Sequence, residues 1–266
     1  MKSTNSKSRL ISSKISIAFL IAGILTLLFS IFYDIQALAL TGLGFIFFGV
    51  LFFLVRPQRY VEWGLLDAVS IPIYSTVDRI INDFKYESTG YYIPPVPEAS
   101  NLPAHLEALR DIVVFISSNL NTTLPSVDEM SKGKFLIKKS KGVLITPPGS
   151  ELLTHIEKQL RVNFTNMNLV ELCEVLPHLI IENLNMGKSM EMRPLENEIY
   201  MKIIDSLYVN LFTHGNLASV KLIGDPIVSA TACAIAKASN KLITIQKQVL
   251  STDNLTLEVW YKIIEG

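Results

Sequence analysis

The sequence predicts an α+β protein in which an N-terminal transmembrane helical hairpin precedes a cytoplasmic domain with a mainly antiparallel sheet and packed helices. The first observation is a pair of uncharged apolar stretches at 15–33 and 35–55. The second is the rest of the chain, where short β-branched runs and amphipathic helical patterns end in a helix followed by a hairpin. Strands and helices arranged in this way are typical of α+β domains with one shared core.

The two apolar stretches are long enough to cross a bilayer. They contain 19 and 21 residues, and at 1.5 Å rise per residue each matches a hydrocarbon core of ~30 Å. Because only residues 33–36 are available to connect them, we expect an antiparallel pair. Small residues on one face of each stretch predict close helix packing. These residues are Ala18, Ala22, Thr26 and Ser30 in the first stretch, and Ala39, Gly42 and Gly49 in the second.

The positions of the charges predict the orientation of the hairpin. The basic tail 1–14 carries four cations and no acid, Arg56 and Arg59 follow the second stretch, and the connection holds only Asp34. Cations are retained on the cytoplasmic side, so we expect a multi-pass protein of the cell membrane with both termini in the cytoplasm. A cleaved signal peptide is disfavoured, because the apolar run is long and a second one follows at once.

An amphipathic juxtamembrane helix is predicted at 57–84, directly after the second stretch. Apolar residues recur on one of its faces, and Pro72 is expected to bend the helix or to begin it anew. The stripe consists of Val69, Ile73, Val77, Ile80 and Phe84. It could pair with another copy of the chain, lie on the membrane surface or pack on the soluble domain. A Pro-rich connection follows at 85–104, with a short edge strand predicted at 91–93.

A soluble α+β domain is predicted at 105–266. Compact β-branched runs predict strands at 112–117, 135–137, 142–146, 190–193, 198–204, 242–249 and 255–263. Apolar periodicity predicts helices at 152–160, 169–184 and 226–238. Pro177 is expected to divide or kink the second helix, while Asp225 and Pro226 open the third as its N-cap and first helical residue.

The composition of the chain excludes several functional classes. From residue 56 onward 20 Lys plus Arg stand against 23 Asp plus Glu, which predicts no nucleic-acid partner, because such partners need a clustered basic face. Cys173 and Cys233 stand alone, and the four histidines lack metal-ligand spacing, so no metal is predicted. No phosphate-binding loop or nucleophile motif is present, so we predict neither a cofactor nor a catalytic residue.

The predicted ligand-binding turn is formed by Gly224, Asp225 and Pro226. A helix N-terminus presents N–H groups and the positive end of the helix dipole, which together can hold an anion. Asp225 would also bring a negative charge to this position. The turn is therefore predicted either as an anion site or as a self-capped helix start.

Three segments of the chain carry a family resemblance. They are the run Gly142–Gly149, the turn Gly224–Pro226 and the Ala-rich run Ser229–Ala238 before the closing hairpin. Together they resemble an uncharacterised group of archaeal membrane proteins, which implies two N-terminal spans and a cytoplasmic domain of unknown function. The closing order of Gly-x-Pro, helix and hairpin is also similar to vinyl-reductase-type ligand-binding domains, where cysteines hold a ligand or metal. Only Cys233 lies in this region, so the metal role is not carried over.

Three functions compete on the sequence alone. The leading expectation is a non-enzymatic, membrane-anchored cytoplasmic binding, sensor or scaffold domain, with the lipid bilayer and a homo-oligomer or membrane-complex partner as its contacts. The first alternative is a membrane-surface enzyme acting on lipid or lipid-linked substrates, with Asp225, His214 and Lys221 as candidates. The second alternative is an accessory subunit of a membrane transport complex. The small residues along the apolar stretches, which would allow another membrane helix to pack closely, are the reason to consider it.

Overall fold

The computed structural model describes residues 4–33, 35–54, 63–85, 89–95, 111–118, 124–132, 134–213 and 217–264. The chain divides into two compact units, Met1–Val61 and Glu62–Gly266. Asp34, Arg56, Arg59 and His214 lie outside the described residues, as do most of the predicted Pro-rich connection and the side chains of the basic tail.

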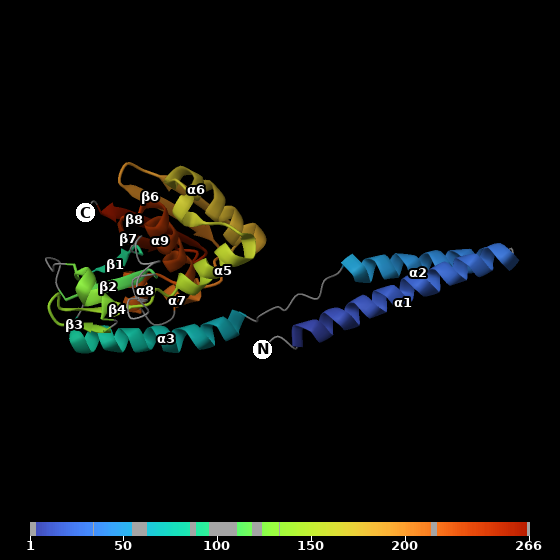
Figure 1. The fold of residues 1–266 in the computed structure, drawn as a ribbon, viewed down its shortest axis with the longest axis horizontal. Coiled ribbons are helices and arrows are strands. Elements are labelled where there is room, and N and C mark those ends of the chain that lie inside the picture. Colours follow the sequence, from blue (N-terminus) through green and yellow to red (C-terminus); the bar gives the residue numbers. More distant parts are fainter. Residues whose placement is uncertain are drawn as a thin grey trace. The chain divides into compact units, whose positions relative to one another are not determined.

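The first unit is a hairpin of two helices, α1 (Thr4–Tyr33) and α2 (Gln36–Leu54), as predicted (Figure 1). The stretches Ser16–Tyr33 and Gln36–Phe53 have the length and hydropathy of membrane spans, and only 17% and 11% of their residues are buried within the structure. Exposed apolar surface of this extent is unfavourable in water. These helices indicate a membrane protein.

A third stretch, Ala218–Ser239, also has the length and hydropathy of a span, but 78% of it is buried inside the second unit. It consists of two helices, α8 (Ala218–Ile223) and α9 (Pro226–Ser239), and the chain turns between them at Gly224, where φ is 68°. Two short helices with a turn between them do not cross ~30 Å of hydrocarbon. This stretch therefore belongs to the core of the second unit.

The second unit is built on one antiparallel sheet, which confirms the predicted fold class. Its strands are β1 (Gly90–Ile93), β2 (Val113–Ser117), β3 (Leu136–Ile137), β4 (Gly142–Ile145), β5 (Ser189–Pro194), β6 (Glu198–Ile204), β7 (Leu242–Leu250) and β8 (Thr256–Ile264). Their order across the sheet is β3-β4-β2-β1-β7-β8-β6-β5. The prediction of 91–93 as an edge strand is wrong, because β1 pairs with β2 on one side and β7 on the other.

Helices complete the core, some of them in contact with the sheet and others packed on neighbouring helices. They are α3 (Trp63–Phe84), α4 (Val127–Ser131), α5 (Ser150–Leu160), α6 (Leu169–His178), α7 (Asn210–Thr213), α8 and α9, with a short 3₁₀ turn at Phe164–Asn166. The central helix is α9, which contacts β1 and β7 as well as α5 and α6 (Figure 1). Every residue from Ile227 to Ala236 is buried, because alanines let the neighbouring elements approach closely.

The start of α9 follows the sequence prediction. Asp225 is the N-cap and accepts hydrogen bonds through Oδ1 from the N–H groups of Ile227 (2.7 Å) and Val228 (2.9 Å), and Pro226 is the first helical residue. Pro177 lies within α6, which passes into a π-helical turn at Leu179–Asn183. A wider turn of this kind is often found at functional sites.

The juxtamembrane helix α3 is continuous through Pro72, and its described part begins at Trp63. It packs on the soluble unit through Tyr74 and Ile81, which are 3% and 1% exposed. The predicted apolar stripe lies on another face: Val69 is 63% exposed and Ile73 is 58% exposed. The prediction that the stripe packs on the protein's own domain is therefore wrong for Val69 and Ile73. The half-buried Val77 does pack against the core.

Candidate functional site

The turn predicted to bind a ligand is buried and is filled by protein groups. Asp225 is fully buried. The Tyr74 hydroxyl donates a hydrogen bond to the carbonyl of Gly224 (2.9 Å), and the Tyr92 hydroxyl lies 2.9 Å from Ser229 Oγ. The first N–H groups of α9 are also used, since that of Ser229 donates to the carbonyl of Asp225 (2.8 Å). This turn supports the centre of the fold and presents no free N–H group to a ligand.

Burial makes the ionised form of the Asp225 carboxyl unfavourable. Burial raises its pKa to about 6, against the opposing effect of the backbone hydrogen bonds from Val228 and Ile227. Its Oδ2 atom has no hydrogen-bond partner among the described residues. Burial likewise raises the pKa values of Tyr74, Tyr92 and Tyr261, with the Asp225 charge adding to each rise. The protonated form of this carboxyl is therefore stabilised by folding.

The candidates for an enzyme site are not brought together on one accessible surface. Lys221 is exposed on α8, where its backbone carbonyl accepts a hydrogen bond from Gln248 Nε2 (2.9 Å). Asp225 has no exposed surface. His214 lies outside the described residues. The described residues also contain no cluster of three His, Cys, Asp or Glu side chains that could hold a metal ion.

The small residues predicted to pack the membrane hairpin divide into two groups. A methyl group added at Gly42 would lie 3.0 Å from the carbonyl oxygen of Gly23, and one added at Gly49 would lie 2.8 Å from Leu20 Cγ. Ser30 is buried, and Thr26 and Ala39 are half-buried. Ala18 and Ala22 are exposed. On α1 the close contact is thus made by Gly23, one position further along the helix than Ala22.

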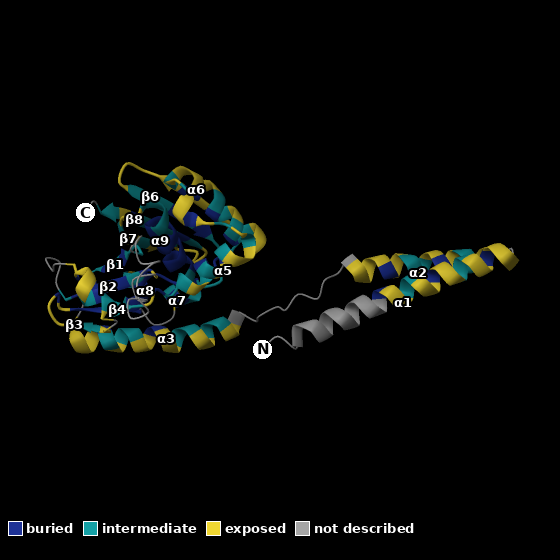
Figure 2. Ribbon diagram, in the orientation of Figure 1, coloured by how far each residue is buried: buried dark blue, intermediate teal, exposed yellow. Residues whose placement is uncertain are grey.

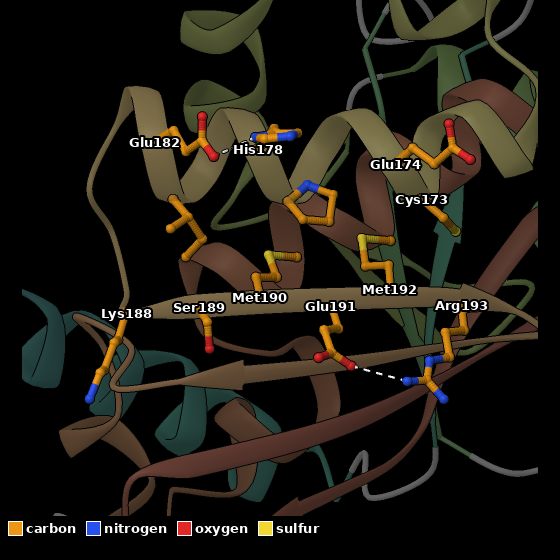
Figure 3. A pocket seen from close by; sticks show the side chains of 12 residues that line it. Cys173, Glu174, His178, Glu182, Lys188, Ser189, Met190, Glu191, Met192 and Arg193 are labelled. Carbon is orange, nitrogen blue, oxygen red and sulfur yellow. Dashed lines mark hydrogen bonds and ion pairs between the residues drawn. The ribbon is translucent and has the colours of Figure 1, made fainter.

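An open groove of about 480 Å³ lies between α6, with its π-helical turn, and the edge strand β5 (Figure 3). Its lining residues are Cys173, Glu174, Pro177, His178, Ile181, Glu182, Lys188, Ser189, Met190, Glu191, Met192 and Arg193. Strand β5 ends the sheet and, within the described residues, pairs only with β6. The groove therefore opens beside a strand edge that can accept further backbone hydrogen bonds.

The side chains of β5 alternate between the two faces of the sheet, and residues from both faces line the groove at this strand edge. Met190 and Met192 are buried and point toward α6, whereas Ser189, Glu191 and Arg193 point the other way (Figure 3). Methionine is flexible and polarizable, and it adapts to partners of different shape. The two methionines give the groove an adaptable apolar floor.

Two exposed side-chain contacts border the groove, one on the helix and one on the strand. His178 Nδ1 lies 2.8 Å from Glu182 Oε1 on the helix, and Arg193 NH2 lies 3.3 Å from Glu191 Oε2 on the strand. All four side chains are at least 60% exposed, and such pairs contribute at most ~1 kcal/mol to stability.

The groove lacks an activated nucleophile among its described lining residues. Burial and the neighbouring Glu174 carboxylate raise the pKa of the Cys173 thiol to about 11. A reactive cysteine needs a lowered pKa, so this thiol remains neutral at physiological pH.

A second cavity of about 440 Å³ lies across β1, β7 and β8. It is lined by Thr89, Tyr91, Asn197, Thr244, Lys262, Ile263 and Ile264. Thr244 pairs with Tyr91 on one side and with Lys262 on the other, so all three side chains lie on one face of the sheet. The Thr244 hydroxyl is buried without a hydrogen-bond partner in the described part of the chain.

The sequence predicted neither cavity. Strands at 190–193 and 242–249 were expected, but their places in the sheet depend on long-range pairing, which periodicity does not report. The alternation of Met190 and Met192 with Glu191 and Arg193 predicts a strand with one apolar face. It does not predict that this strand ends the sheet.

One known family model covers both units of the chain. A family model described as a domain of unknown function (DUF7982) matches residues 3–261. The chain belongs to this family. Because the DUF7982 match begins before α1 and ends within β8, the two apolar helices and the soluble unit are parts of one family architecture. No curated protein and no solved structure matches the chain.

Proposed function

We propose that this protein is a membrane-anchored cytoplasmic binding domain, acting as a scaffold or sensor, whose groove between α6 and β5 binds an extended segment of a partner polypeptide. The observation that carries the proposal is the edge of β5, which pairs with no further strand in the described part of the chain and lies beside an open groove with a methionine floor. Strand addition of this kind takes affinity from main-chain hydrogen bonds and specificity from side-chain contacts.

The register of β5 supports strand addition. The N–H of Leu195 donates to the carbonyl of Glu198 (2.8 Å) where the β5–β6 hairpin turns. Backbone groups in an antiparallel ladder alternate in direction, so those of Met190 and Met192 point away from β6. Pro194 lies two residues after Met192, so its backbone also faces away from β6. The N–H group that proline lacks would therefore not have bonded to β6. A partner strand would pair with Met190 and Met192 along this edge.

The membrane part of the proposal rests on α1 and α2. The proposed topology is a multi-pass protein of the plasma membrane with both termini in the cytoplasm. It is supported by the cations of residues 1–14, which precede the apolar stretch of α1, by Arg56 and Arg59 after α2, and by Asp34 between the two helices. We also propose an archaeal origin for the chain and a similarity of its C-terminal end to vinyl-reductase-type ligand-binding domains, as the sequence resemblance implies. A lipid-acting enzyme and a subunit of a transport complex are the alternatives.

Site-specific photo-crosslinking in native membranes tests the groove. A photoreactive amino acid placed at Glu174 or Arg193, both on the rim, should capture a discrete polypeptide that mass spectrometry can identify. The same probe at Lys158, which is exposed on α5 outside the groove, is the matched control. Equal capture from all three positions, or capture of none, would reject the proposed binding site. Turnover of a lipid substrate by the purified chain would favour the enzyme alternative.

A further inference from the structure

Helix α3 has two apolar faces, and only one of them has a partner among the residues that the structure describes. The packed face carries Tyr74 and Ile81, both almost fully buried. Two carboxylates beside this face bind other elements: Asp67 Oδ2 accepts from Asn210 Nδ2 (2.8 Å), and Asp78 accepts from the N–H groups at the start of α8 at 3.0 and 2.6 Å. These contacts fix the rotation of α3 relative to the soluble unit.

The second apolar face of α3 is exposed in the first half of the helix, whereas Val77 and Ile80 further along are half-buried. Leu65, Val69 and Ile73 are 58%, 63% and 58% exposed, and Phe84 near the end of the helix is 44% exposed. Leu65, Val69 and Ile73 are spaced by four residues and therefore lie on one face of the helix. Figure 2 shows the exposed residues along the side of α3 that faces away from the sheet. Leu65, Val69 and Ile73 form an exposed apolar patch, which marks an interaction surface.

The position of α3 in the chain indicates what its exposed face binds. Eight residues, 55–62, separate the end of α2 from the start of α3. At 3.3–3.6 Å per residue this connection spans at most roughly 30 Å, so Trp63 stays close to the membrane in which α2 is anchored. The connection also contains Arg56 and Arg59, which anionic lipid headgroups attract.

We propose that the exposed face of α3 lies on the cytoplasmic surface of the bilayer, with Leu65, Val69 and Ile73 inserted at the boundary between headgroups and acyl chains. This inference rests on the proposed membrane anchoring by α1 and α2. An amphipathic helix in the membrane interface buries its apolar face in this way. Because the opposite face of α3 is fixed to the soluble unit, the helix holds that unit in one orientation on the membrane.

Depth measurement with single cysteines tests the inference on the full-length chain. Val69→Cys and Ile73→Cys report the apolar face, while Ser75→Cys and Asn82→Cys report an exposed polar face of the same helix. Each variant is labelled with an environment-sensitive fluorophore and reconstituted into vesicles of phosphatidylcholine and phosphatidylglycerol containing a doxyl-labelled lipid. The native cysteines are buried, so the unsubstituted chain gives the background labelling.

The expected result is a blue-shifted emission and strong quenching by the doxyl lipid at Val69 and Ile73, with emission typical of water and weak quenching at Ser75 and Asn82. Equal quenching at all four positions would overturn the inference. Protection at Val69 and Ile73 that depends on the protein-to-lipid ratio, and not on the doxyl lipid, would also overturn it, because a second copy of the chain would then cover the stripe.

A probe within α2 separates failure of the inference from failure of the anchoring. Leu43→Cys lies in the middle of the apolar stretch and is 61% exposed in the structure. Strong quenching at Leu43 with none at Val69 or Ile73 would reject the interfacial position of α3 and leave the membrane anchor in place. Absence of quenching at Leu43 would reject the anchor itself.

Discussion

Asp225 shows how one residue can be correctly placed by local rules and still differ from its expected role. The sequence Gly224-Asp225-Pro226 predicts a helix N-cap, and the structure contains that cap. Whether the cap is open to an external anion depends on Tyr74 and Tyr92, which approach from α3 and β1. Both tyrosines are more than 130 residues away in sequence, so no local pattern reports their contact.

The Asp225 carboxyl should make stability depend on pH. Its folded-state pKa of about 6 exceeds the ordinary value of 3.8, so folding binds a proton between these values. The resulting stabilisation is complete below pH ~4 and is lost as the pH rises through ~6, a change of roughly 3 kcal/mol. Thermal unfolding of the full chain in detergent between pH 4 and 7 measures it.

Asp225→Asn should abolish this dependence, because the amide oxygen still caps α9 and carries no charge. Asp253→Asn is the control, since Asp253 is fully exposed and hydrogen bonding to Ser251 lowers its pKa. The control variant should retain the loss of stability between pH 4 and 6. An unchanged pH profile in Asp225→Asn would mean that another group is responsible.

Gly149 should tolerate no larger side chain. A methyl group there would lie 2.0 Å from the backbone nitrogen of Ala230 and 2.6 Å from the carbonyl oxygen of Pro226, where α5 meets α9. We expect Gly149→Ala to lower the free energy of unfolding by at least ~1–3 kcal/mol. Gly64→Ala in α3 meets no atom within 4 Å and should be neutral or stabilising by up to ~1 kcal/mol. Equal effects of the two substitutions in thermal unfolding would contradict this packing.

At the scale of elements, the sequence predicts which segments form helices and strands better than it predicts their neighbours. The alternation in 198–204 and 255–263 identifies β6 and β8, because one face of each strand is buried. It does not place β1 in the middle of the sheet, since four residues carry too little pattern to distinguish a central from an edge strand. Strand order is set by long-range contacts.

Helix α3 shows the same limit. The stripe through Val69 and Ile73 is the more regular apolar pattern, yet the face with Tyr74 and Ile81 is the one that packs. Tyr74 is amphipathic, and its hydroxyl is satisfied by the carbonyl of Gly224. Periodicity counts apolar residues and misses a buried side chain whose polar atom has a distant partner.

Blocking the free edge of β5 should abolish partner capture. Met192→Pro removes an N–H group that points away from β6, so a partner strand loses one main-chain hydrogen bond and meets the proline ring. We expect photo-crosslinking from Arg193 to be lost. Met192→Leu keeps the N–H and an apolar side chain and should retain capture. Thermal unfolding of both variants checks that the soluble unit is folded; undiminished capture by folded Met192→Pro would exclude strand addition.

Close packing of α1 against α2 should depend on Gly42. A branched side chain there would meet Leu27 Cγ at 2.9 Å, while a side chain at Gly44 meets no atom within 4 Å. Gly42→Val should therefore weaken cross-linking between cysteines introduced at Leu20 and Gly49 in membranes, and Gly44→Val should leave it unchanged. Equal cross-linking in both variants would contradict the helix contact.

At the scale of the whole molecule, composition alone separates the membrane part from the soluble part. Two uncharged stretches stand out before residue 56, and the structure places the apolar residues of the later stretch Ala218–Ser239 inside the core. The groove between α6 and β5 could not be predicted in this way, because it arises where a helix with a π-helical turn crosses the last strand of a sheet. Its residues become neighbours only when the fold is complete.

The central claim of a membrane-anchored cytoplasmic domain is tested most directly by cysteine accessibility in intact cells. Tyr33→Cys lies at the end of α1, and Lys158→Cys lies on the surface of the soluble unit; the native cysteines are buried. A membrane-impermeant maleimide should label Tyr33→Cys from outside and Lys158→Cys only after the membrane is permeabilised. Labelling of Lys158→Cys in intact cells would contradict the account.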